Sequence, residues 1–307
     1  MRTPAERAGI ERGLVLGVDR HADGGRSIRR QRLDQAFAHE VAMPAGQFGN
    51  IRLYYETSGQ GEPVLFLHGL GSSARDWERQ APVFAERYRV VIPELRGHGR
   101  SEKPPGPYSM ALFASDIAAL IRALNIAPVH VVGLSLGGFV ACQLVVDHGD
   151  LVRSLVLVNS APGLPRHSLQ DRARLAWNLL LRRLIVRLFG MRTLARVLGR
   201  SLFPGADQAE LKRTFIERWE ENQPDAYLAS LAAVSDWGIE DHLDAIRCPV
   251  CVIAGEQDFI PLAYKKTYTR KLPNAELMVI PDSGHLTPLD HSEQFNRTLM
   301  AFLQRQR

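Results

Sequence analysis

The feature that most constrains the fold is a serine between two glycines, Gly133-Leu134-Ser135-Leu136-Gly137, placed directly after an apolar run at 128–132. The β-branched residues of that run predict a buried strand, and the apolar spacing over 138–148 predicts a helix. Ser135 is therefore expected where a strand turns sharply into a helix. Such a turn exposes the hydroxyl and directs the backbone N–H groups that follow toward whatever the hydroxyl attacks. Side chains at 133 and 137 would collide in so tight a bend, which explains the glycines.

Three further apolar runs predict strands, and each run ends in a cluster of polar residues. The runs and their clusters are 64–67 with 68–73, 249–254 with 255–258, and 277–280 with 281–285. In an open parallel α/β sheet the carboxyl ends of the strands share one edge, where ligands bind. We therefore expect Ser135, Asp258 and His285 to converge there although they are distant in the sequence.

These three residue types are suited to nucleophilic catalysis. A serine hydroxyl is a poor nucleophile near neutral pH and needs a base that takes its proton as it attacks. Histidine fits this task because its ordinary pKa, about 6.5, lies near neutrality. An aspartate that accepts a hydrogen bond from the second ring nitrogen fixes the tautomer and stabilises the imidazolium. Asp258 is the preferred acid, with Glu256 and Asp282 as alternatives.

The order of these motifs resembles that of α/β-hydrolase-fold enzymes of the single-domain, esterase-like type. The motifs that carry the resemblance are His68-Gly69-Leu70-Gly71, Arg96-Gly97-His98-Gly99, the Ser135 turn, and the loops of Asp258 and His285. The similarity extends from about Gln47 to the C-terminus, and the chain order Ser, Asp, His is that of the family. The resemblance implies a mostly parallel, doubly wound sheet with a helical cap inserted after the sixth strand. It also implies an oxyanion hole formed by the backbone N–H groups of Leu70 and Leu136.

Two departures from related enzymes narrow the chemistry. Epoxide hydrolases and haloalkane dehalogenases of this fold carry an aspartate where this chain has Ser135, so an acyl-enzyme on serine is favoured. The ring-cleavage C–C hydrolases usually have Gly-x-Gly-Pro-Gly in the oxyanion loop. The corresponding Gly69-Leu70-Gly71-Ser72-Ser73 lacks the proline.

The expected organisation is a core interrupted by the cap. Residues 41–160 and 238–307 are predicted to form the core, which begins with a hairpin turning at Gly49-Asn50. Residues 161–237 have no strand pattern and are predicted to be a helical cap, divided by Gly190, Gly199, Pro204-Gly205 and Pro224. Residues 1–40, rich in both arginines and acids, are interpreted as a flexible extension without a catalytic role.

The first part of the cap is strongly basic. Residues 166–200 hold nine arginines and one acid, a charge of about +8 against +5 for the whole chain. Trp177, Leu181, Leu184 and Leu188 follow helical spacing and form an apolar stripe, with Arg183 among the arginines on the opposite face. A solvated cap surface explains this pattern. Attraction of an anionic substrate, or contact with an acidic carrier or an anionic membrane surface, explains it as well.

Composition limits the remaining possibilities. The three cysteines, Cys142, Cys248 and Cys251, give no disulfide pattern, and the short apolar run at 14–16 is not a signal peptide. No stretch approaches the ~20 apolar residues of a spanning helix, so we expect a cytoplasmic chain without a transmembrane segment. No metal-ligand spacing, organic-cofactor motif or nucleic-acid-binding motif accompanies these features.

The sequence therefore predicts a serine hydrolase that needs no cofactor and cleaves small, hydrophobic carboxylic esters through an acyl-enzyme on Ser135. A C–C hydrolase or a lactonase with the same three residues is the nearest alternative. A small-molecule receptor with low turnover, and acyl transfer to an acceptor other than water, also stay open.

Overall fold

The computed structural model describes residues 44–165, 168–235 and 237–306. The expected N-terminal extension, residues 1–40, lies outside these ranges.

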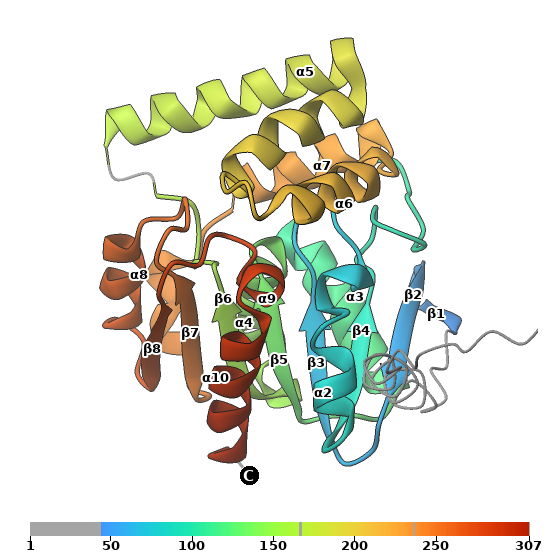
Figure 1. The fold of residues 1–307 in the computed structure, drawn as a ribbon. Helices are drawn as coiled ribbons and strands as arrows, with labels where there is room; N and C mark the ends of the chain where they lie inside the picture. Colours follow the sequence, from blue (N-terminus) through green and yellow to red (C-terminus); the bar gives the residue numbers. More distant parts are fainter. Residues whose placement is uncertain (1–43, 166–167, 236, 307) are drawn as a thin grey trace, which may run out of the picture. The chain divides into compact units, whose positions relative to one another are not determined.

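The described residues form an eight-stranded sheet with the strand order β1-β2-β4-β3-β5-β6-β7-β8 (Figure 1). β1 and β2 form the expected hairpin, β2 and β4 are also antiparallel, and all other pairs are parallel. The carboxyl ends of β3 to β8 therefore share one edge of the sheet. The strands are β1 (Ala45–Phe48), β2 (Ile51–Ser58), β3 (Glu62–Leu67), β4 (Tyr88–Pro93), β5 (Val129–Leu134), β6 (Val152–Val158), β7 (Val250–Gly255) and β8 (Ala275–Ile280).

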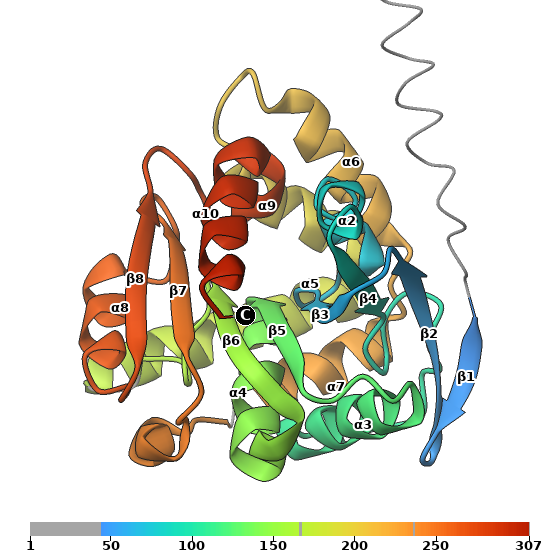
Figure 2. The ribbon, with the colours of Figure 1, turned by 90° about the horizontal axis from the view of Figure 1, so that it is seen from below.

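Helices cover both faces of the sheet, so the predicted α/β fold with a doubly wound sheet is confirmed. Figure 2 shows α3 and α4 on one face and α2 and α10 on the other. Because both faces are covered, the central strands are apolar throughout. On β5, for example, Val131 belongs to the hydrophobic core of one face and Val132 to that of the other. The bounds are α2 (Ala81–Ala85), α3 (Met110–Ala123), α4 (Leu136–His148), α8 (Leu262–Thr269), α9 (Thr287–Asp290) and α10 (Ser292–Gln304), with 3-10 turns at Ala74–Trp77, Gly149–Leu151 and Glu240–Ala245.

The expected helical insertion follows β6. It consists of α5 (Leu169–Leu202), α6 (Ala209–Glu220) and α7 (Pro224–Ser235), and these helices lie beyond the carboxyl ends of the strands (Figure 1). Gly190 interrupts α5 as predicted, with φ 78° and ψ 175°. Gly199 does not divide the insertion as predicted, because α5 continues through it to Leu202.

Candidate active site

Ser135 occupies the strained turn that the glycines predicted. It follows β5, precedes α4 and has φ 52° and ψ −113°, a backbone conformation that a non-glycine residue rarely adopts. A side chain on Gly137 would overlap the carbonyl oxygen of Leu67 on the neighbouring strand. Hydrogen bonds hold the turn in place, since the Ser135 N–H donates to Val158 at 3.0 Å and the Ser160 hydroxyl donates to the Ser135 carbonyl at 2.7 Å. The turn is therefore fixed by the backbones of β3 and β6.

The loops after β7 and β8 bring Asp258 and His285 together. The Nδ1 atom of His285 lies 2.6 Å from Oδ1 of Asp258, and both side chains are buried. Burial raises the pKa of Asp258, but the adjacent His285 ring and the Lys265 ammonium outweigh burial and leave that pKa below its ordinary value. The two alternative acids contact each other instead, because the Glu256 carboxylate accepts the Asp282 N–H at 3.3 Å. Of the three acids, Asp258 is the one hydrogen-bonded to His285.

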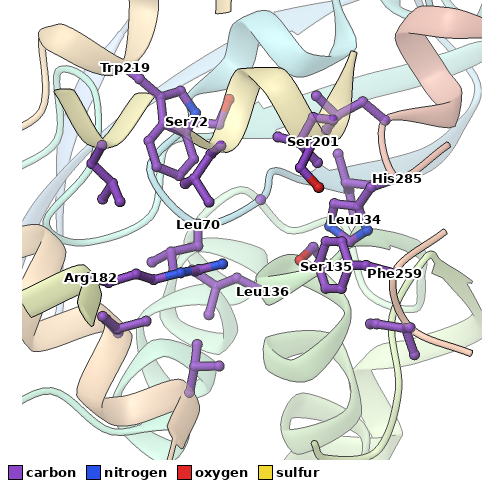
Figure 3. Close-up of a pocket in the computed structure, with 18 of the residues that line it drawn as sticks. Leu70, Ser72, Leu134, Ser135, Leu136, Arg182, Ser201, Trp219, Phe259 and His285 are labelled. Carbon is purple, nitrogen blue, oxygen red and sulfur yellow. The ribbon is translucent and has the colours of Figure 1, made fainter. Parts of the chain in front are cut away.

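Ser135 and His285 line the same cavity. Figure 3 shows the Ser135 hydroxyl directed toward the edge of the His285 ring. Phe259, the residue after Asp258, lies against that ring with the two centroids 4.1 Å apart and the planes tilted by 34°. Phe259 is itself 59% exposed. The sequence did not identify this residue, which covers one side of the imidazole.

A buried lysine and asparagine, both missed by the sequence analysis, support the Asp258 carboxylate. Lys265 of α8 has no exposed surface, and its ammonium donates to Oδ2 of Asp258 and, at 2.9 Å, to Oδ1 of Asn159. The Asn159 amide donates in turn to the carbonyls of Gly284 and His285, at 3.0 and 2.8 Å. Asn159 follows β6, so the ends of three neighbouring strands are joined through one side chain.

The loop after β3 holds Leu70 beside the serine turn. Asp76 supports this loop, since one carboxylate oxygen accepts the Gly69 N–H at 3.0 Å and the other accepts the Ser72 hydroxyl. Leu136 is the first residue of α4, where backbone N–H groups have no partner within the helix. Within the described ranges, neither the Leu70 nor the Leu136 amide donates to a backbone or side-chain acceptor. Both N–H groups are thus free to bind an anion.

His68 and His98, the histidines of the two upstream motifs, are buried, and their ring nitrogens contact the backbone of the loops after β3 and β4. The Nε2 atom of His68 accepts the Leu95 N–H at 3.0 Å, while its Nδ1 lies 2.8 Å from the Gly69 carbonyl. Burial lowers the pKa of His68 and lowers that of His98 to about 3. These rings are therefore neutral and connect the ends of β3 and β4.

The cavity above Ser135 has a volume of about 530 Å³ and lies between the sheet edge and the cap. Its walls are mainly apolar, and Arg182 of α5 extends its guanidinium toward Leu136 (Figure 3). The apolar lining residues include Leu70, Leu134, Phe139, Leu175, Leu179, Ile185, Leu198, Trp219, Leu231 and Phe259. A volume of this size is typical of small-molecule sites. Among the described side chains, no cluster of three His, Cys, Asp or Glu residues is arranged to hold a metal ion.

Comparisons with known proteins agree with the fold described above. The sequence model described as the alpha/beta hydrolase fold matches residues 62–292. A candidate carbamate hydrolase of a Caulobacter species is 31% identical over 265 residues, which cover 82% of this chain and 95% of that protein. The 3-oxoadipate enol-lactonase 2 of Acinetobacter baylyi is 26% identical over 263 residues, covering 83% and 94% of the two chains. The solved structure of a thermophilic esterase from Thermogutta terrifontis superimposes with a TM-score of 0.76 at 25% identity and covers 86% of this chain and 97% of that one.

Proposed function

Because the chain belongs to the alpha/beta hydrolase fold family, we propose that it is a serine hydrolase that cleaves carboxylic esters through an acyl-enzyme on Ser135. The observation that carries this proposal is that His285, hydrogen-bonded to the buried Asp258, lines the same cavity as Ser135. Because the Asp258 carboxylate is hydrogen-bonded to Nδ1 of His285, the other ring nitrogen, Nε2, is the one available to Ser135. That is the arrangement in which an imidazole deprotonates an alcohol.

In the proposed reaction, the Ser135 oxygen attacks the carbonyl carbon of the ester while Nε2 of His285 takes the hydroxyl proton. The tetrahedral oxyanion accepts hydrogen bonds from the N–H groups of Leu70 and Leu136. When the intermediate collapses, the C–O bond to the alcohol breaks and the imidazolium returns its proton to the leaving oxygen. A water molecule then attacks the acyl carbon, with His285 again as the base, and releases the acid and free Ser135.

The two oxyanion donors are backbone groups, so their contribution depends on loop geometry. Loss of one such donor raises a barrier by about 3 kcal/mol in other enzymes. Here the N–H of Leu136 is fixed by the start of α4, and that of Leu70 by the Asp76 carboxylate under its loop. Substitutions at Leu70 and Leu136 should therefore act through the backbone and not through the loss of their side chains.

The substrate class that fits the cavity is a small ester with an apolar acyl or alkyl group. The lining is dominated by leucine, isoleucine and aromatic side chains, and Arg182 offers one cationic group for a polar or anionic substituent. The similarity to an esterase and to an enol-lactonase supports ester cleavage, and a lactone is itself a cyclic carboxylic ester. Open-chain esters and lactones are accordingly the first substrates to test.

The direct test is labelling with a fluorophosphonate together with turnover of a p-nitrophenyl ester series of increasing acyl length and of a lactone series. We expect labelling and turnover in the wild-type chain, and neither in Ser135→Ala. Ser201→Ala is the matched control, because Ser201 lines the same cavity and should keep both activities. Labelling that persists in Ser135→Ala would remove this residue as the nucleophile. Labelling without turnover of any ester or lactone would favour a receptor.

A further inference from the structure

The first segment of α5 carries an apolar stripe that faces solvent. Trp177 is 63% exposed, Leu188 is 69% exposed, and Leu180 and Leu184 lie between them on the same side of the helix. A stripe at this spacing ordinarily packs on a hydrophobic core. The structure instead places Leu175, Leu179 and Ile185 toward the cavity, and no other element of the described residues covers the Trp177 side. Figure 1 shows α5 as the outermost helix of the cap, beyond α6 and α7.

Basic side chains border this stripe. Arg172 and Arg183 are exposed and form no ion pair with a described residue, whereas Arg187 pairs with Asp225 at 3.1 Å. The predicted stripe is thereby corrected, since Leu181 lines the cavity and the more exposed Leu180 belongs to the outer face. With 100° between successive helix positions, Arg183 and Arg187 lie next to Leu180 at one edge of the exposed stripe and not on the face opposite it. Asp171, the single acid of the arginine-rich segment, bonds to the Ser168 cap at the start of the helix. The outer face of α5 therefore combines a tryptophan and leucines with uncompensated positive charge.

Exposed apolar patches of this kind mark interaction surfaces. A second copy of the chain would meet the leucines but would also bring two sets of arginines together. An acidic protein would match the arginines but leave the tryptophan–leucine stripe without an apolar partner. A lipid surface with anionic headgroups matches both features, since the leucines enter the acyl boundary, the tryptophan lies at the interface and the arginines bind phosphates.

We propose that the outer face of α5, defined by Trp177, Leu180, Leu184 and Leu188 with Arg172 and Arg183, binds peripherally to anionic membranes. The helix lies flat on the surface and does not cross it. In the described part of the chain, no helix combines the length and apolarity needed to span a bilayer. Because the inner side of the same helix lines the substrate cavity, membrane binding places the cavity next to the lipid phase.

The test is co-sedimentation of the full chain with vesicles of pure phosphatidylcholine and of an equimolar mixture with phosphatidylglycerol. We expect binding to the anionic vesicles, little binding to the neutral ones and release by high salt. Binding should shift the tryptophan emission to the blue, and Trp177→Phe should abolish the shift, since the other tryptophans are at least partly covered.

Two double variants separate the apolar and the electrostatic contributions. Leu184→Asn/Leu188→Asn removes two leucines of the apolar stripe, and Arg172→Gln/Arg183→Gln removes two positive charges beside it. Each double variant should weaken partitioning into anionic vesicles at least about tenfold. None of these four residues lines the cavity, so hydrolysis of a soluble short ester should not change and confirms folding.

Matched controls lie away from the cap. Val83→Asn/Met278→Asn removes two exposed apolar side chains elsewhere, and Arg297→Gln removes an exposed charge on α10; all should bind vesicles like the wild type. The proposal would be overturned if the Leu184→Asn/Leu188→Asn variant bound anionic vesicles as strongly as the wild type. It would also be overturned if the wild type bound neutral and anionic vesicles equally. A dimer in solution that the same variant dissociates would show that a second copy covers this face and would also overturn it. All three results are independent of whether Ser135 is the nucleophile.

Discussion

The buried contact between Lys265 and Asp258 makes a quantitative prediction. Both side chains have no exposed surface, and the carboxylate is shared between the lysine ammonium and the His285 ring. Replacing Lys265 with Met keeps most of the apolar length of the side chain but leaves Oδ2 of Asp258 without its donor, while Oδ1 of Asn159 keeps only the Gly255 N–H. An uncompensated buried charge is more costly than the pair that it replaces.

The expected size of the effect follows from that burial. Removal of one partner of a buried ion pair costs about 3–5 kcal/mol, and a chain of this length loses about 2–4 °C of Tm per kcal/mol. Lys265→Met should thus lower Tm by about 6–20 °C. Asp258→Asn leaves the ammonium unpaired and should cost a similar amount. The double variant Lys265→Met/Asp258→Asn removes both charges, so its loss should be smaller than the sum of the single losses by more than about 2 kcal/mol.

The assay is a double-mutant cycle on the free energy of urea unfolding, with Tm as a second measure. Arg305→Met is the control, because it removes an ion pair with Glu276 that is largely exposed and should cost less than about 1 kcal/mol. Additive losses in the cycle, or a cost of Lys265→Met no larger than that of the control, would refute the view that this lysine supports the carboxylate. Hydrolysis by Lys265→Met, measured below its Tm, should fall less than hydrolysis by Asp258→Asn, which removes the acid itself.

Three further predictions concern the turn, the oxyanion loop and pH. Gly137→Ala should prevent folding or abolish fluorophosphonate labelling, because its methyl group would overlap the Leu67 carbonyl, and a soluble variant with full labelling would contradict the geometry. Asp76→Ala removes the acceptors of both the Gly69 N–H and the Ser72 hydroxyl, so ester kcat should fall about tenfold or more with KM little changed; a pure KM effect would separate Asp76 from the oxyanion loop. The pKa of Asp258 is lowered on folding, so the stability that it contributes is present above pH ~4 and is lost as pH falls through the folded-state pKa. Urea unfolding should show a smaller acid-induced loss in Asp258→Asn than in the wild type.

The location of the proposed active site was largely predictable, because a parallel sheet places the residues that follow its strands along one edge. Ser135 and His285 each follow a short apolar run, and parallel strands place all such ends along one edge. The acid was harder to predict, since Glu256, Asp258 and Asp282 lie in the same two loops and spacing alone does not fix the direction of a loop side chain. The structure distinguishes them, because the Asp258 carboxylate lies 2.6 Å from the His285 ring, whereas the Glu256 carboxylate accepts the backbone N–H of Asp282.

The supporting residues could not be identified from motifs, although one of them had a usable signal. Asn159 directly follows β6, so the argument that placed Ser135 after β5 also places this amide at the same edge. Lys265 gave no comparable signal, because it lies in a polar helix next to a second lysine, and a lysine in such a helix is ordinarily exposed. Only the packing of α8 against β7 shows which of the two lysines enters the interior.

The cap shows where helical periodicity stops being informative, and this has a testable consequence. α5 carries apolar residues on two sides, so spacing alone does not decide whether Ile185 or Leu184 faces the cavity. The structure assigns Ile185 to the cavity wall and Leu184 to the outer surface. Ile185→Phe should therefore narrow the cavity and lower kcat/KM for long acyl esters more than for acetyl esters, with vesicle binding unchanged. Leu184→Asn combined with Leu188→Asn should give the opposite pattern, with chain-length preference kept and vesicle binding lost. If either substitution changed both properties to the same extent, the two faces of α5 would not act separately, and the assignment of one to substrate and the other to lipid would be wrong.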